Sequence, residues 1–368
     1  MIGEQDHGDG STMLAKSRLV KYLHEEKGFN VLAFEGDFFA LNEGWEQLPK
    51  EGEQIERFLK ENIYPVWSDC GQCGDLLYSY VPSTFLTLSP LQVTGFDNQI
   101  GSFEFSKGQI KKSIDQYLQH KKVKYTELKR YQRFLYHLNM IGAPVSPSMK
   151  GEFQEGMKWF VQSADSVLEQ LGPDASRDLE YLTLESLREF AKARLHPDDY
   201  VKSHNLRDVQ MAKNLQWLAY TKYPEEKIIV WAANGHIMKN ADTAIKGKKT
   251  AAIGWMGTTF AKDSLNASQT YVLGFSSLQG TYKRTTEKEE KAVPRPLKQG
   301  FETWIDKRVA YGFVDFKPFR LLYPQYDKMF MMKPRQFNMT GNWTSVFDGI
   351  FYIRDMMPCE TLGAKEKL

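Results

Sequence analysis

Histidine and carboxylate side chains stand directly after several apolar runs of the sequence, which is where a catalytic site could form. They are Glu4, His7, Glu35, Asp97 and His236. A neutral imidazole can accept a proton at neutral pH, and a carboxylate beside it can orient the ring and stabilise the imidazolium. A second histidine can donate to a developing oxyanion or to a leaving oxygen. These residue types therefore supply the groups needed to activate a water molecule for hydrolysis.

The apolar runs before these side chains are typical of strands that are buried on both faces. They comprise residues 1–3, 31–34, 91–94 and 228–231. In an open parallel sheet, ligands bind beyond the carboxyl ends of the strands. If the four strands are neighbours, the two histidines and three carboxylates converge on one crevice.

The segment between the first two runs has the spacing of an amphipathic helix. Leu14, Leu19, Val20 and Leu23 recur at helical intervals, and Gly28 is a typical C-terminal stop. Strand, helix and strand within about 30 residues form a βαβ unit, which predicts a parallel sheet. Further strands are expected at residues 251–255, 270–275 and 347–353, the first two as an antiparallel pair.

The middle of the chain is helix-rich, with long amphipathic stretches at residues 110–120, 125–140, 153–171 and 177–195. A segment with Pro144 and Pro147, residues 141–148, separates two of them. We predict an α/β fold with a mostly parallel core sheet flanked by helices and a large helical insertion, or cap. The predicted core comprises residues 1–105 and 224–368, and the cap comprises residues 106–223, packed over the active-site crevice.

Composition excludes several classes of protein. The 368 residues carry 48 basic and 46 acidic side chains, and a net charge of +2 gives no electrostatic case for nucleic-acid binding. No apolar run approaches the ~20 residues of a membrane helix. The first residues lack the basic start and apolar stretch of a signal peptide. We expect a cytoplasmic protein, or an exported one if a signal precedes the strand-like start in a longer natural chain.

The cysteines and serines offer weaker candidates for chemistry. Cys70 and Cys73 have the spacing of a redox or zinc pair, but zinc needs two more ligands and a redox pair normally opens a helix after a strand. We interpret the pair as incidental, and three cysteines in all do not indicate a disulfide framework. Ser11 and Ser17 lie in no Gly-x-Ser-x-Gly elbow, which argues against a serine nucleophile.

Each candidate site residue also has a purely structural interpretation. A histidine after a strand, such as His236, is more often a loop or packing residue. Glu35 directly follows a buried strand, where a carboxylate is costly unless it has a partner, so the two interpretations are equally weighted. Glu4-x-x-His7 is a short motif whose neighbouring glycines also fit a turn.

Three blocks of the sequence resemble the signature blocks of the erythromycin esterase family: GEQDHGDGST, VLAFEGD and WAANGHIMKN. In that family a Gly-Glu-x-x-His block is followed by a basic residue nine positions after the histidine and a glutamate nineteen positions later, matched here by Lys16 and Glu35. An Asn-x-His block is matched by Asn234 and His236. The stretch that begins at Arg207 resembles the helix before this block.

The resemblance implies a metal-independent hydrolase that acts on ester bonds, including macrolide lactones, with no cofactor. It implies that His7 is the general base, that Glu4 and Glu35 hold His7 and the water, and that His236 supports the site from the other side. The expected partner is a small-molecule ester or lactone. The expected substrate-binding residues are Lys16, Asp97, Asn234 and Arg207.

Two departures from the family pattern bear on the substrate more than on water activation. The antibiotic-inactivating members carry arginine where Lys16 stands, and histidine where Ala233 stands. Lysine keeps the charge but lacks the planar fork of arginine.

Two alternative functions stay open from the residues alone. One is a metal-dependent hydrolase that uses the same carboxylates and histidines as ligands, and the other is a haem- or small-molecule-binding protein on the same scaffold.

Overall fold

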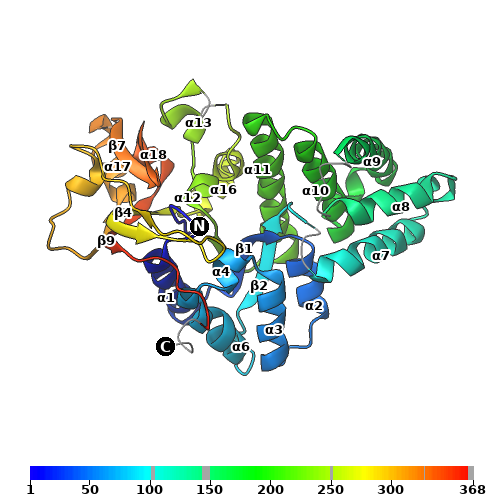
Figure 1. Ribbon diagram of the computed structural model, residues 1–368, viewed down its shortest axis with the longest axis horizontal. Coiled ribbons are helices and arrows are strands. Elements are labelled where there is room, and N and C mark those ends of the chain that lie inside the picture. Colours follow the sequence, from blue (N-terminus) through cyan, green and yellow to red (C-terminus); the bar gives the residue numbers. More distant parts are fainter. Residues whose placement is uncertain (101–103, 143–149, 249–251, 327, 364–368) are drawn as a thin grey trace. The chain divides into compact units, whose positions relative to one another are not determined.

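The computed structural model describes residues 1–100, 104–142, 150–248, 252–326 and 328–363. The chain forms two compact units, which are described separately (Figure 1). The first comprises Met1–Glu35, Pro49–Gln92 and Glu226–Leu368, and the second comprises Gly36–Leu48 and Val93–Glu225. The predicted helical insertion, residues 106–223, falls within the second unit.

The strands are β1 (Val31–Asp37), β2 (Gln92–Asp97), β3 (Ile228–Trp231), β4 (Leu273–Tyr282), β5 (Lys291–Ala292), β6 (Tyr311–Asp315), β7 (Phe330–Arg335), β8 (Phe337–Gly341) and β9 (Gly349–Met356). The α-helices of the first unit are α1 (Gly10–Lys27), α3 (Gly52–Asn62), α4 (Pro65–Ser68), α5 (Gly71–Gly74), α6 (Val81–Thr84), α12 (Asn234–Ile237), α13 (Ala241–Ala244), α15 (Met256–Phe260), α16 (Ser264–Gln269), α17 (Phe316–Leu322) and α18 (Trp343–Val346). Those of the second unit are α2 (Trp45–Gln47), α7 (Glu104–His120), α8 (Tyr131–Met140), α9 (Lys150–Leu171), α10 (Leu179–Arg194) and α11 (Tyr200–Trp217).

A parallel sheet forms the centre of the first unit. β1 pairs in parallel with β3, from Val31 opposite Ile228 to Phe34 opposite Trp231. The first residues of the chain continue this sheet, because Ile2 bridges in parallel to Trp231 on one side and to Leu273 of β4 on the other. The strand expected at residues 1–3 is thus a short central one, placed between β3 and β4.

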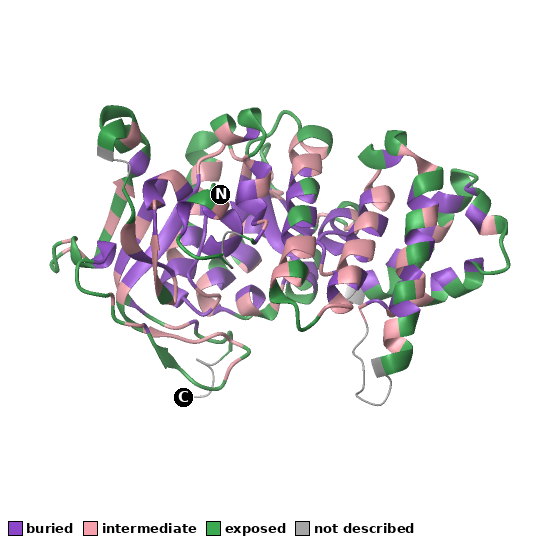
Figure 2. Ribbon diagram, turned by 90° about the horizontal axis from the view of Figure 1, so that it is seen from above, coloured by how far each residue is buried: buried purple, intermediate pink, exposed green. Residues whose placement is uncertain are grey.

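The sheet continues beyond β4. β4 pairs in parallel with β9, β6 pairs antiparallel with the other edge of β9, and β5 pairs antiparallel with the end of β4. Buried residues lie on β1, β3, β4 and β9, among the purple ribbons of Figure 2, whereas β5 and β6 carry none. The predicted α/β class with a mostly parallel core is confirmed.

The expected antiparallel pairing of residues 251–255 with residues 270–275 is wrong. Residues 252–255 form no strand, and residue 251 lies outside the described residues. Both edges of β4 are already occupied in parallel, by Ile2 on one side and by β9 on the other. No edge of β4 is therefore free over residues 273–275 for a hairpin partner.

The predicted helix after the first strand is α1. It buries Met13, Lys16 and Val20 on one face and packs against β9 and α5. It ends where Gly28 adopts a left-handed φ of 65° and donates its N–H to the carbonyl of Leu23, a conformation that glycine adopts without steric cost. Its start places the preceding loop, residues 4–9, at the carboxyl end of the central strands.

The second unit is built from helices packed around one apolar core. Phe134 of α8 stacks on Phe160 of α9 with ring centroids 5.6 Å apart, and both side chains are fully buried. Aromatic pairs of this geometry add to the stabilisation that burial alone gives. Of the predicted proline-containing break at residues 141–148, residues 143–148 lie outside the described residues. Among the described helices, none combines the length and apolar character needed to cross a membrane.

Candidate active site

The site of the first unit lies at the ends of three adjacent parallel strands. Glu4 follows the strand at Ile2, Glu35 lies near the end of β1, and His236 lies in α12, directly after β3. Because these strands are neighbours and run in the same direction, their carboxyl ends meet at one edge of the sheet. The observed strand pairing therefore brings Glu4, Glu35 and His236 to one edge of the sheet, where the sequence analysis expected them.

Glu4 connects His7 and Lys16. Its Oε1 lies 3.1 Å from Nδ1 of His7, and its Oε2 accepts a hydrogen bond from the Lys16 ammonium. The side chains of Glu4 and Lys16 are fully buried, whereas that of His7 is 21% exposed. With Nδ1–H directed at the carboxylate, the other imidazole nitrogen of His7 carries the lone pair that can accept a proton.

Lys16 is held inside the first unit. Its Nζ lies 4.1 Å from the centroid of the Trp231 ring, a cation–π contact, and 3.4 Å from the carbonyl oxygen of Ala232. Burial lowers the pKa of Lys16, and the carboxylate of Glu4 acts in the opposite direction. The predicted role of Lys16 in substrate binding stays a prediction, since its contacts are those of a residue that positions Glu4.

Glu35 and His236 form a second pair of carboxylate and imidazole. Nε2 of His236 lies 3.2 Å from Oε1 of Glu35, and the other carboxylate oxygen accepts the backbone N–H of Ala233 at 3.0 Å. Both side chains are nearly buried, with 4% of Glu35 and 10% of His236 exposed. Each histidine of the site therefore has its own glutamate partner.

The segment after β3 joins the two pairs. The backbone N–H of Asn234 donates to the carbonyl of Glu4 at 2.8 Å, one residue after Ala233 donates to Glu35. The two glutamates are thus connected through the N–H groups of consecutive residues, Ala233 and Asn234.

The side chain of Asn234 is engaged by backbone groups. Its amide nitrogen donates to the carbonyls of Phe275 and Pro334, at 2.7 Å each, and its carbonyl oxygen accepts the N–H of Phe275 at 3.1 Å. Its predicted substrate contact stays a prediction. The observed bonds fix the start of α12, which carries His236.

Aromatic rings enclose the first pair. The Trp67 ring meets His7 edge-on with centroids 5.2 Å apart, and Phe34 packs between Trp67 and Trp231 at 6.0 and 5.4 Å. All three aromatic side chains are buried. No local signal in the sequence connects Trp67 of α4 with His7, because the two residues are 60 positions apart.

A buried polar network supports the loop between Glu4 and His7. Gln5 donates from Nε2 to the carbonyl of Lys333 at 2.6 Å and accepts from the Ser277 hydroxyl at 2.6 Å. Lys333 in turn donates its backbone N–H to Glu302 and its ammonium to the carbonyl of Pro294, at 2.7 and 2.6 Å. These bonds attach the loop to β4 and β7.

Lys333 makes the stability of the first unit depend on pH. Burial lowers its pKa from 10.5 to about 8, so between these values the unfolded chain binds more protons than the folded chain. The wild-type protein should therefore gain stability relative to Lys333→Met as pH rises from 8 to 10. Urea unfolding of both proteins across this range measures the difference, and a difference that stays constant or falls would contradict the assignment.

Asp97 and Arg207 belong to the second unit and pair with each other. The guanidinium donates from Nε and Nη2 to the two oxygens of Asp97, at 3.1 and 2.7 Å. Asn214, also on α11, donates to the carbonyl of Phe96 at 3.1 Å. These bonds attach α11 to the end of β2, and the predicted contact of Asp97 and Arg207 with a substrate stays a prediction.

The cysteines differ from their sequence interpretation. Cys70 forms a disulfide with Cys359, across 289 residues of sequence, and Cys73 is a free buried thiol. Describing Cys70 as incidental was therefore wrong. Spacing alone gave no signal, because the partner lies at the opposite end of the chain.

Comparison with known proteins places this geometry in context. The family model described as erythromycin esterase matches residues 24–355. The putative hydrolase YbfO of Bacillus subtilis (strain 168) is 28% identical over 327 residues, which cover 81% of this chain and 69% of that protein. Both descriptions are those of hydrolases, which supports the predicted class of enzyme.

Solved structures share the fold. A crystal structure of a Bacillus cereus protein has a TM-score of 0.73 at 18% identity, covering 98% of this chain and 89% of that one. A succinoglycan biosynthesis protein has a TM-score of 0.66 at 19% identity, with 98% and 88% covered. A mutant of the erythromycin esterase EreC in its open conformation has a TM-score of 0.65 at 15% identity, with 98% and 91% covered.

Proposed function

Since the chain belongs to the erythromycin esterase family, we propose that it hydrolyses ester bonds with His7 as the general base. The contact that carries this proposal is the one between Nδ1 of His7 and Oε1 of Glu4, at 3.1 Å. It leaves the second imidazole nitrogen to draw a proton from water while the carboxylate stabilises the imidazolium that forms. Lys16 holds Glu4 in place from the opposite side.

The second pair supplies the complementary step. When water attacks an ester carbonyl, negative charge develops on the carbonyl oxygen and then on the leaving oxygen. A protonated His236, held by Glu35 at 3.2 Å, can donate to either oxygen. The proton that His7 removes from water then balances the one that the leaving oxygen receives.

Hydrolysis should not depend on a metal ion. The Glu4 carboxylate already accepts from the Lys16 ammonium, and a divalent cation placed there would be repelled by that charge. Treatment with EDTA or a phenanthroline chelator is therefore expected to leave turnover within about twofold of the untreated protein. Loss of activity on chelation with recovery on adding zinc, manganese or magnesium would favour the metal-dependent alternative instead.

The substrate class is a small-molecule ester or lactone. This chain has Lys16 and Ala233 where the antibiotic-inactivating members of the family carry arginine and histidine. Macrolides are therefore one class of substrate among several to be tested. The test is incubation of the protein with a panel of aryl esters, alkyl esters and macrolide lactones, followed by mass spectrometry. For a lactone the proposal predicts a product heavier by one water, and for an open ester it predicts the free acid and alcohol.

A panel without any turnover, together with a Soret absorption after haem is added, would instead support a binding protein on this scaffold. The imidazoles of His7 and His236 are each held by a glutamate, as general acid–base groups require. This arrangement favours the hydrolase.

A further inference from the structure

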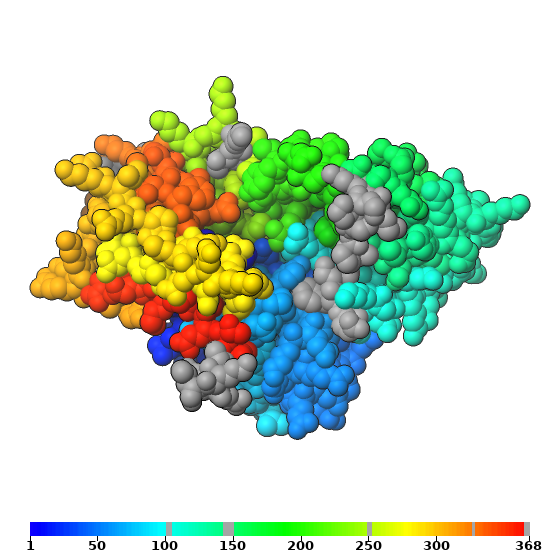
Figure 3. Space-filling model, in the orientation of Figure 1, coloured from blue at the N-terminus to red at the C-terminus, as the bar shows by residue number. Residues whose placement is uncertain are grey.

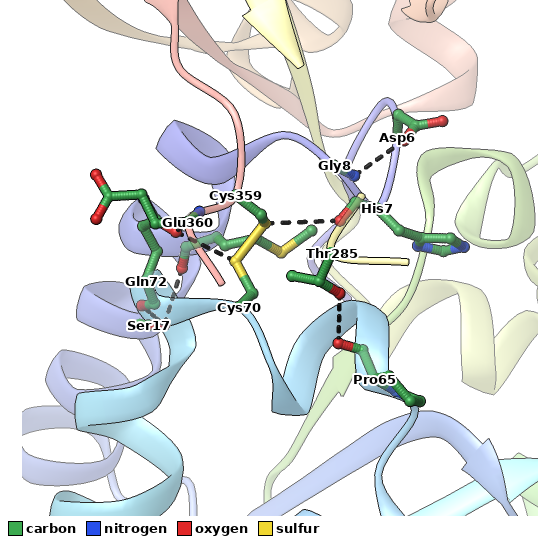
Figure 4. The surroundings of a disulfide bond; sticks show 11 residues. Asp6, His7, Gly8, Ser17, Pro65, Cys70, Gln72, Thr285, Cys359 and Glu360 are labelled. Carbon is green, nitrogen blue, oxygen red and sulfur yellow. Dashed lines mark hydrogen bonds between the residues drawn. A yellow bond between two sulfur atoms is a disulfide. The ribbon is translucent and has the colours of Figure 1, made fainter. Parts of the chain in front are cut away.

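The C-terminal segment, residues 357–362, lies directly against the loop that carries His7 (Figure 4). The N–H of Cys359 donates to the carbonyl of Gly8 at 3.1 Å, and Pro358 bridges to Asp9. The sulfur of Cys359 lies 3.7 Å from the carbonyl oxygen of His7 itself. Because both sulfurs of the disulfide lack a proton, this last contact is a packing contact rather than a hydrogen bond.

The opposite side of the same segment is attached to α5. The carbonyl of Glu360 accepts the N–H of Gly71 at 2.7 Å, and the N–H of Leu362 donates to Asp69 at 2.9 Å. The Cys70–Cys359 disulfide adds a covalent bond between the C-terminal segment and the residues at the start of α5. In Figure 3 the segment, in red, lies on this face beside the blue residues of the helices that precede β2.

The loop backbone packs closely against this segment and against the residue that follows β4. A Cβ atom on Gly10 would lie 2.3 Å from the carbonyl oxygen of Pro358, and one on Gly8 would lie 2.5 Å from the backbone of Lys283. The loop backbone is thus enclosed between the C-terminal segment on one side and the end of β4 on the other. Its position depends on both walls staying in place.

We propose that the Cys70–Cys359 disulfide is a redox-sensitive positioning element for His7. The bond holds the C-terminal segment as one wall of the His7 loop, and its reduction releases that wall. The effect on turnover rests on the proposed function, whereas the effect on the loop does not. Such a bond persists in oxidising compartments and is rare in the reducing cytosol.

The chemical step is a two-electron reduction by a dithiol. One thiolate of the dithiol attacks a sulfur of the bond, the S–S bond breaks, and the second thiol closes the dithiol into its own disulfide. Cys70 and Cys359 each gain one electron and one proton. Cys73, three residues from Cys70, does not compete in this exchange, because burial raises the pKa of its thiol to about 12 and only a thiolate attacks.

The experiment compares the oxidised protein, the protein treated with dithiothreitol, and the variants Cys359→Ser and Cys70→Ser. Alkylation under denaturing conditions first counts the thiols: one reactive cysteine of three is expected before reduction, and three after it. Three alkylated cysteines in the untreated protein would overturn the proposal. Cys73→Ser is the control variant, since it keeps the disulfide and removes the only other thiol.

Two readouts follow, and the first does not depend on activity. Hydrogen exchange of the backbone amides of residues 11 and 359 should accelerate roughly tenfold on reduction and in both variants, while the amides of β1 keep their rates. Unchanged exchange would overturn the proposal. The second readout is ester turnover, where kcat should fall roughly tenfold as His7 is displaced and KM should change little.

The two readouts separate this proposal from the proposed function. Faster loop exchange with unchanged kcat would show that the disulfide does not position His7, and would overturn the inference. If the oxidised protein hydrolyses no ester at all while loop exchange still responds to reduction, the structural part stands and the esterase proposal fails. Reduction of the wild-type protein provides the test if a serine variant does not fold.

Discussion

Replacing His7 by asparagine is expected to lower kcat for ester hydrolysis by roughly 10²–10⁴-fold, the usual contribution of a general base. Asparagine can still donate to Glu4 from its amide, so the buried ion pair of Glu4 with Lys16 keeps a partner on that side. The imidazole is 21% exposed. Its replacement should therefore lower the unfolding free energy by less than it raises the activation free energy that corresponds to the fall in kcat. Steady-state kinetics and urea unfolding of the same preparation separate the two effects.

The matched control for this variant is His120→Asn. His120 is exposed at the end of α7, in the second unit, and is not part of either imidazole–carboxylate pair. Its replacement should leave kcat and KM within about twofold of wild type, because surface substitutions of this kind have small effects. If His7→Asn retained wild-type turnover, His7 would not be the base.

Replacing Lys16 by methionine is expected to produce the largest loss of stability of any substitution at the site, about 3–5 kcal/mol. Methionine keeps the apolar length of the side chain but removes the ammonium. Glu4 is then left as a fully buried carboxylate without its cation. An unpaired buried charge is far more costly than a buried pair, and replacing both members relieves much of that cost. The double variant Lys16→Met/Glu4→Gln should therefore be more stable than Lys16→Met alone.

A second ion pair on the same helix provides the control. Lys21 of α1 pairs with Asp75, but 25% of Lys21 and 77% of Asp75 are exposed to solvent. Lys21→Met should change the unfolding free energy by no more than about 1 kcal/mol, as expected for an exposed pair. Equal effects of Lys16→Met and Lys21→Met would mean that burial of the Glu4 pair does not matter. So would a double variant no more stable than Lys16→Met.

The candidate site could be proposed from the sequence because its residues stand at strand ends. Buried parallel strands appear as uninterrupted apolar runs, and polar residues that follow such runs lie at the edge where ligands bind. Glu4, Glu35 and His236 were placed at this edge by that argument, and the spacing from His7 to Lys16 added the family resemblance. The helix α1 was equally accessible, since its apolar spacing and Gly28 are local signals.

The pairing within the site could not be read from the sequence. Both glutamates were expected to serve His7, but Glu4 pairs with His7 and Glu35 pairs with His236. Which carboxylate meets which imidazole depends on the register of neighbouring strands, and that register is set by packing across the sheet. The burial of Lys16 is equally a tertiary property, since its partners include Ala232, more than two hundred residues later.

Strand partners were also beyond local reasoning. The sequence predicts a strand at residues 270–275, but its partner β9 begins only at Gly349. Because the two strands are parallel, no tight turn connects them, and the sequence carries no local signal of their pairing. The disulfide of Cys70 with Cys359 is a contact of the same kind, because it connects segments that only the folded chain brings together. Local signals thus locate elements, while contacts between distant segments follow from the sheet.

The most direct test of water activation by His7 is hydrolysis of an ester in water enriched in oxygen-18. The acid product and the intact protein are then analysed by mass spectrometry. The wild-type protein is predicted to place one labelled oxygen in each acid that it releases, to carry no acyl adduct during turnover, and to lose this activity in His7→Asn. An acyl adduct on the protein would contradict direct attack by a water that His7 activates. Release of labelled acid by His7→Asn at the wild-type rate would contradict it as well.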